Sequence, residues 1–122
     1  SNEELSILHE KYEATLIPED RFEYSEFMQK DGEFHLEIIK LTRNQKLVDI
    51  YKQLNSHVQI VRFQKARKRK KPLPWTNQDH QEILEALRSR DPERARMAIQ
   101  DHRSKARKAF LTDSEPDHAQ QQ

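Results

Sequence analysis

The chain has 122 residues, of which 34% are hydrophobic and 35% are charged, and its formal net charge is +1. This length allows one domain at most, and so few apolar residues make a thin core that a partner or a further segment would complete. The small net charge argues against a general nucleic-acid-binding polycation. The chain has no Cys and no apolar run near the roughly 20 residues that span a bilayer, so we expect a soluble, cytoplasmic protein without disulfides or thiolate metal sites.

The composition favours helices, because sheets and tight hairpins consume glycine and this chain has a single Gly. We therefore predict an all-α fold, an antiparallel bundle of long helices. The first helix is expected over about residues 2–16, where apolar side chains recur three or four residues apart. The second is expected to begin at Pro18, a residue favoured at the first helical position, and to run to Thr42.

Gly32 lies inside this second predicted helix. An interior glycine costs about 1 kcal/mol relative to alanine, so it indicates a place where another group approaches closely. The third helix is expected to begin at Asn44, a good N-cap. Its inward face is predicted to consist of the apolar side chains Leu47, Ile50, Tyr51, Leu54, Val58 and Val61.

The last two helices follow a proline-rich break at residues 71–75. Thr76 is predicted to cap the fourth helix, with Asp79 completing a capping box. Asp91 and Pro92 are predicted to be the N-cap and first residue of the fifth helix. The sequence thus predicts one helical domain over residues 1–111 and a disordered polar tail over residues 112–122.

One carboxylate and three imidazoles could converge in such a bundle. Asp31 and His35 are four residues apart, so they lie one turn apart on one face of the second helix. His80 lies early in the fourth helix and His102 midway along the fifth. Together they would suit a divalent ion such as Zn²⁺ or Ni²⁺. Taken singly, each has a simpler interpretation as a surface ion pair or a solvated histidine.

Two other features have open interpretations. Seven of the ten residues from Arg62 to Lys71 are basic. They could bind phosphate, but we favour a solvated helix C-terminus whose cations face the negative end of the helix dipole. Trp75, in the proline-flanked loop, would line a ligand entrance or, more commonly, seal one end of the bundle.

Four stretches of this sequence resemble, in order and spacing, the FCD domain, the effector domain of FadR-like GntR regulators. Residues 31–39 resemble its D-x-x-F-H-x-x-I signature, and residues 42–47 its N-P-x-L helix junction. Residues 79–87 resemble its E-H-x-x-I-x-x-A segment, and residues 90–95 the start of its last helix, with His102 at its closing histidine. The resemblance covers about residues 3–111. Gln45, Asp79 and Arg103 depart from the residues usual in the family.

The resemblance implies a ligand-sensing and dimerisation domain, not an enzyme. It implies that Asp31, His35, His80 and His102 bind a divalent metal ion, with Zn or Ni as the expected cofactor. It also implies a small organic acid as effector, a homodimer, and DNA binding through a winged helix-turn-helix domain outside this chain. The family's opening helices, with an arginine that grips the effector, are also expected outside the chain, which would make this bundle truncated on its N-terminal side.

Two alternatives to a sensor domain remain at this stage. A metal-dependent, hydrolase-like enzyme would use an open metal site to activate water, but no further carboxylate is clearly placed as its general base. A helical interaction module would have no metal site at all. Neither the effector nor the operator follows from the sequence.

Overall fold

The computed structural model describes residues 1–66 and 75–113, which form five α-helices and one 3₁₀ helix and contain no strand. This confirms the predicted all-α bundle. The elements in chain order are α1 (Asn2–Ala14), η1 (Glu19–Arg21), α2 (Tyr24–Lys40), α3 (Gln45–Ala66), α4 (Thr76–Arg88) and α5 (Pro92–Asp113).

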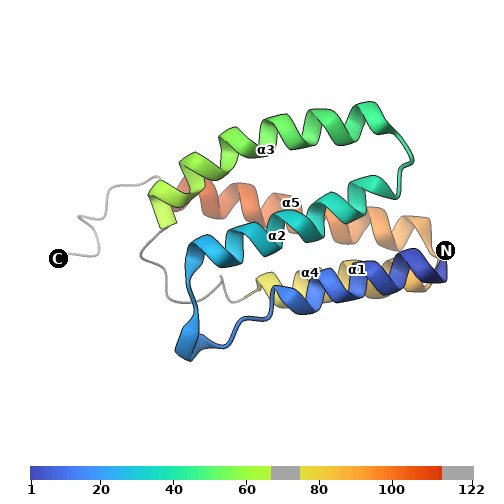
Figure 1. The fold of residues 1–122 in the computed structure, drawn as a ribbon. Helices are drawn as coiled ribbons and strands as arrows, with labels where there is room; N and C mark the ends of the chain where they lie inside the picture. Colours follow the sequence, from blue (N-terminus) through green and yellow to red (C-terminus); the bar gives the residue numbers. More distant parts are fainter. Residues whose placement is uncertain (67–74, 114–122) are drawn as a thin grey trace.

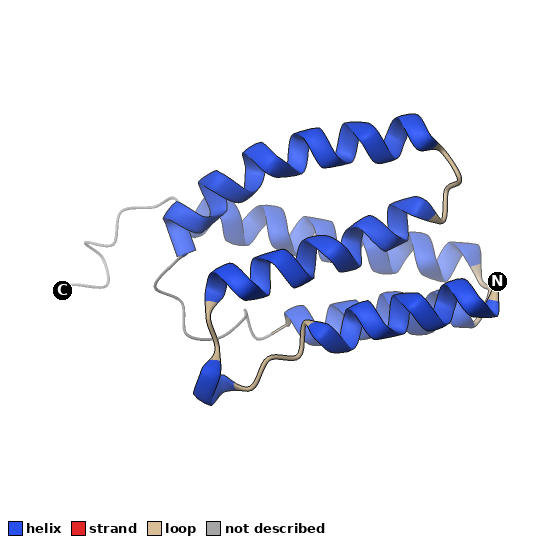
Figure 2. Ribbon diagram, viewed as in Figure 1, coloured by secondary structure: helices blue, strands red, loops and turns tan. Residues whose placement is uncertain are grey.

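The helices run alternately in opposite directions along one common axis (Figure 1). Helix α2 lies between α1 and α3 and contacts both, and α4 and α5 pack as an antiparallel pair behind this row (Figure 2). Helix α4 also contacts α1, and α5 contacts α3. None of the helices within the described residues is both long and apolar enough to cross a membrane.

The core consists of small apolar clusters that join neighbouring helices. Leu8, Phe34 and Leu84 tie α1, α2 and α4 together, and all three are at most 1% exposed. A second cluster joins α4 to α5, and its members are Ile83, Ala86 and Ala98. Phe34 contacts both α1 and α4, so it sets the rotation of α2 about its axis. This rotation in turn sets the direction in which the next residue, His35, points.

Helix α2 begins six residues later than predicted, at Tyr24 instead of Pro18. Pro18 instead precedes η1, and both Phe22 and Glu23 have extended backbone. This break lets Phe22 fold back onto Phe27, with ring centroids 5.6 Å apart. In an uninterrupted helix these two residues, five apart, would point away from each other.

Of the three predicted N-caps, two are confirmed and one is wrong. The backbone N–H of Leu47 donates to the Asn44 side chain at 3.1 Å, and Asp91 accepts similarly from Glu93 and Arg94. Thr76, in contrast, is the first residue of α4 and is buried, and Trp75 takes the N-cap position without a side-chain hydrogen bond. Asp79 therefore forms no capping box, because its carboxylate is directed to α5.

The predicted inward face of α3 is also largely wrong. Its aliphatic members are at least 41% exposed, and they are Leu47, Ile50, Leu54, Val58 and Val61. Only Tyr51 of that face is half-buried, and the neighbouring Val48 is 5% exposed. The described residues thus leave one apolar side of α3 uncovered, in keeping with a bundle whose core is thin.

The close approach predicted at Gly32 is confirmed. A Cβ atom at this position would lie 2.8 Å from Nε2 of Gln59 and 3.2 Å from Nδ2 of Asn55, both on α3. The missing side chain leaves room for Gln59, which donates a hydrogen bond to the backbone carbonyl of Met28 at 3.3 Å. Gly32 thereby lets the polar side of α3 reach α2.

The exposure of α3 can be tested by comparing a Leu→Ala substitution in the core with one on the exposed side of α3. Leu84→Ala should lower the free energy of unfolding by about 2–5 kcal/mol, because the side chain is 1% exposed and its removal leaves a cavity. Leu54→Ala should cost less than about 0.5 kcal/mol, because that side chain is 59% exposed. Urea unfolding followed by circular dichroism at low protein concentration measures both. Equal losses would contradict the arrangement of α3.

Candidate metal centre

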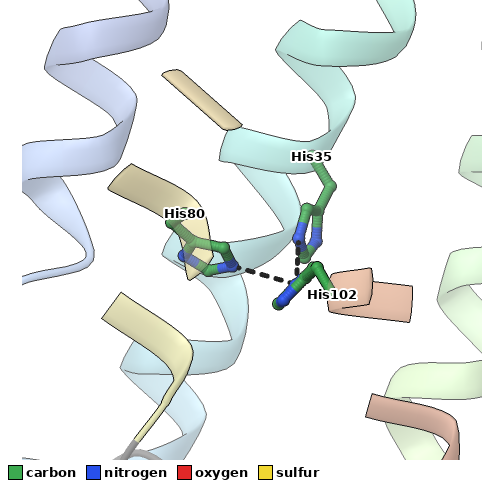
Figure 3. Close-up of side chains that lie close together, drawn as sticks. All are labelled: His35, His80 and His102. Atoms are coloured by element: carbon green, nitrogen blue, oxygen red, sulfur yellow. Dashed lines mark hydrogen bonds between the residues drawn. The ribbon is translucent and has the colours of Figure 1, made fainter. Parts of the chain in front are cut away.

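Three helices bring three imidazoles and a carboxylate to one point between them. Asp31 and His35 come from α2, His80 from α4 and His102 from α5. The imidazoles of the three histidines point toward one another (Figure 3), and each offers a ligand atom within 4.8 Å of the other two. The sequence-predicted site residues are thus all brought together.

The spacing of the donor atoms is that of a coordination shell. The Nε2 atom of His102 lies 3.3 Å from Nε2 of His35 and 3.2 Å from Nε2 of His80. Oδ1 of Asp31 lies 3.3 Å from Nε2 of His80. Four ligands arranged tetrahedrally around Zn²⁺ at 2.0–2.1 Å are about 3.3 Å apart. These three distances match that spacing, so the residues could hold a single metal ion.

Asp31 is almost fully buried, with a side chain 4% exposed. Burial alone would raise the pKa of Asp31, but the adjacent His35, His80 and Arg62 outweigh it and lower this pKa below its usual value. The carboxylate is therefore ionised at neutral pH. Its Oδ2 atom lies 3.4 Å from Nδ1 of His35, so Asp31 contacts two of the three histidines.

His80 is fully buried, and its ring packs on Phe34 with centroids 4.7 Å apart. Burial lowers the pKa of His80 to about 3, although the charge of Asp31 partly offsets this effect. The imidazole is thus neutral at physiological pH, which is the form that binds metal ions. Its Nδ1 atom has no hydrogen-bond partner among the residues that the structure describes.

His102 is oriented by the carboxylate of Asp79, which the sequence pattern predicts to be part of a capping box. Its Nδ1 atom lies 3.3 Å from Oδ2 of Asp79, and Nζ of Lys105 donates to Oδ1 of the same carboxylate at 2.9 Å. A proton held on Nδ1 by Asp79 leaves a lone pair on Nε2, directed at the other histidines. Burial and the neighbouring His35 lower the pKa of His102, and its hydrogen bond to Asp79 opposes them.

Two further residues that the sequence analysis did not count among the ligands border the site. Trp75 packs edge-on against His102 with centroids 5.9 Å apart, so it borders the site as well as the end of the bundle. Arg62, counted above among the cations of a solvated helix end, reaches Asp31 instead. Residues 67–74 of the basic run and the following loop lie outside the described residues. The sequence shows that residue 62 is an arginine, but it does not show that the charge of this arginine faces Asp31.

The other histidines stay away from this centre. His57 is exposed on α3, and His9 pairs with Glu13 near the surface. His118 lies outside the described residues.

Fold and site together define a class of protein: an all-α bundle with a buried histidine–carboxylate cluster that could hold a metal ion. The sequence profile of the FCD domain matches residues 1–105. The chain therefore belongs to the FCD domain family, whose members are effector-binding regulatory domains of GntR-type transcription factors and are generally not catalytic. Comparison with curated proteins and with solved structures gave no match.

The lowered pKa of His80 predicts how stability depends on pH. Between its usual pKa of 6.5 and about 3, the unfolded chain binds a proton that the folded chain does not. The free energy of unfolding of chelator-treated protein should therefore fall as the pH is lowered from about 6.5 towards 4. Urea titrations across this range measure the slope.

His80→Gln should make that slope shallower, because the side chain that titrates only on unfolding is gone. His57→Gln is the matched control, and the slope should persist there because His57 is exposed. An unchanged slope in His80→Gln would show that His80 is not the neutral, buried group described here.

Proposed function

We propose that this chain is the metal-dependent sensor domain of a GntR-type transcriptional regulator and that Asp31, His35, His80 and His102 bind one divalent ion. The observation that carries the proposal is the chain of close donor atoms: Nε2 of His102 lies 3.3 Å from that of His35 and 3.2 Å from that of His80, which in turn lies 3.3 Å from the buried Asp31 carboxylate. Three imidazoles and one carboxylate favour Zn²⁺ or Ni²⁺ over Mg²⁺ or Ca²⁺, which prefer oxygen ligands.

A bound ion would supply net positive charge and open coordination positions, which suit the oxygen atoms of a small organic acid. The protein's own residues prepare the site for it. Asp31 contributes the negative charge, the buried His80 stays neutral, Asp79 orients His102, and Phe34 closes the apolar side. The carboxylate of Asp79 is engaged by His102 and Lys105, so it is not free to serve as the general base that a hydrolase would need.

In the whole regulator, binding of the acid would shift the balance between two arrangements of a homodimer. A two-fold dimer matches the two half-sites of a palindromic operator, so a change in arrangement would alter the spacing of the DNA-binding domains. The DNA contact itself would belong to a winged helix-turn-helix domain. Such a regulator works where the DNA is, in the cytoplasm.

Zinc binding tests the proposal directly. Wild-type protein, stripped with a chelator and dialysed, should bind one Zn²⁺ per chain in calorimetric titration. His35→Ala, His80→Ala and His102→Ala should each weaken binding by at least about 100-fold, because changes outside the ligand shell already cost about 10–100-fold. His57→Ala should bind like wild type, because this histidine is exposed on α3. Wild-type protein that binds no zinc, or His57→Ala as defective as the other three variants, would rule the site out.

The effector class is tested by thermal unfolding of zinc-loaded and zinc-free protein. Gluconate, lactate and succinate represent sugar acids, hydroxy acids and dicarboxylates, and glucose is the uncharged control. At least one acid should raise the Tm of the zinc-loaded protein, and none should raise that of the zinc-free protein, because a ligand stabilises only the form that it binds. A shift with glucose and none with the acids would contradict an anionic effector.

A further inference from the structure

Helix α3 faces the candidate metal centre with its polar side. Its half-buried residues after Val48 recur every three or four positions, and they are Tyr51, Asn55, Gln59 and Arg62. The apolar residues between them, such as Leu54 and Val58, are exposed. A helix that packs on a core normally buries its apolar side. Here the opposite orientation places Tyr51 and three polar side chains along the α2 face that carries Asp31.

Arg62 is the charged member of this row and the one that reaches the site. Its Nη1 atom lies 3.7 Å from Oδ2 of Asp31, and its side chain is 30% exposed. A distance of 3.7 Å is longer than a charge-assisted hydrogen bond, which is about 2.7–2.9 Å. Arg62 thus neutralises Asp31 from the solvent side without a tight bond to it.

A bound divalent ion would add a second cation beside the same carboxylate. Arg62 lies near Oδ2 of Asp31 and the oxygen that faces His80 is Oδ1, so the guanidinium and the ion would share one negative charge. Two cations this close repel each other in a site of low dielectric constant. The repulsion is relieved if the guanidinium gains an anion of its own, and a carboxylate matches its planar, bidentate geometry.

We infer that Arg62 couples metal binding to anion binding: it pairs with Asp31 when no ion is bound and holds the carboxylate of the effector when an ion is bound. Arg62 would then supply, within this chain, an anchor for the effector, a role that the family resemblance places outside it. Gly32 makes this possible, because its missing side chain lets Gln59 and Asn55, and with them the row that ends in Arg62, approach α2. The inference rests on the proposed function.

The coupling predicts opposite effects from one substitution. Arg62→Met removes the cation that competes with the ion, so Zn²⁺ affinity should rise by about tenfold. The same change removes the partner of the carboxylate, so the Tm shift that an acid causes in zinc-loaded protein should be lost. If Arg62 had a purely structural role, its replacement would weaken the binding of both zinc and the acid, or of neither.

The experiment measures Zn²⁺ alone by competition with a chromophoric chelator, and then the Tm shifts with gluconate, lactate and succinate. Arg62→Lys keeps the charge, so its zinc affinity should stay within about threefold of wild type, while its acid shift should shrink because lysine lacks the bidentate fork. Arg94→Met is the matched control. It removes an arginine that pairs with Glu82 at the surface, at 2.9 Å, and should change neither readout.

The outcomes separate this inference from the proposed function. If wild type binds no zinc, or no acid shifts its Tm, the proposed function fails and the coupling falls with it. If wild type responds to both but Arg62→Met binds zinc no more tightly, or keeps its acid shift, only the role of Arg62 is wrong. Should Arg62→Met fail to fold, Arg62→Lys decides: an undiminished acid shift overturns the inference, and a reduced shift with normal zinc affinity supports it.

Discussion

The ionised carboxylate of Asp31, buried near the middle of the bundle, is the constraint on which the rest of the site depends. A buried charge is costly unless it is paired, and here three helices supply the partners. His35 comes from α2 itself, Arg62 from α3 and His80 from α4. Removing any one of them would leave this buried charge less well compensated. The position of each helix around α2 is therefore tied to this one charge.

Helix α2 organises the bundle because adjacent residues on it face different neighbours. Gly32 meets the polar side of α3, Phe34 packs against α1 and α4, and Asp31 and His35 face the candidate metal centre between them. Consecutive residues of a helix point in directions about 100° apart. The five positions from Asp31 to His35 can therefore contact three helices and the site at once. A shift of α2 by one residue would misplace all of these contacts together.

Burial also sets the protonation of the site before any ligand arrives. It lowers the pKa values of His80 and His102, so both imidazoles are neutral when Asp31 is ionised. Neutral imidazoles and a carboxylate anion are the forms that coordinate a metal. Burial of the histidines thus keeps them in the form that a metal ion would need, and the guanidinium of Arg62 faces the remaining negative charge.

The sequence by itself determined what depends on near neighbours along the chain: helical periodicity, the caps at Asn44 and Asp91, and the placement of Asp31 and His35 one turn apart. Their convergence with His80 and His102 was predicted only with the help of a family resemblance. The tertiary structure alone decided which side of each helix is buried. A stripe of apolar residues shows that α3 is amphipathic but not what covers it, and its polar side faces the site. In the same way Asp79 orients His102, and Arg62 pairs with Asp31, through contacts between residues 23 and 31 positions apart, which no local pattern specifies.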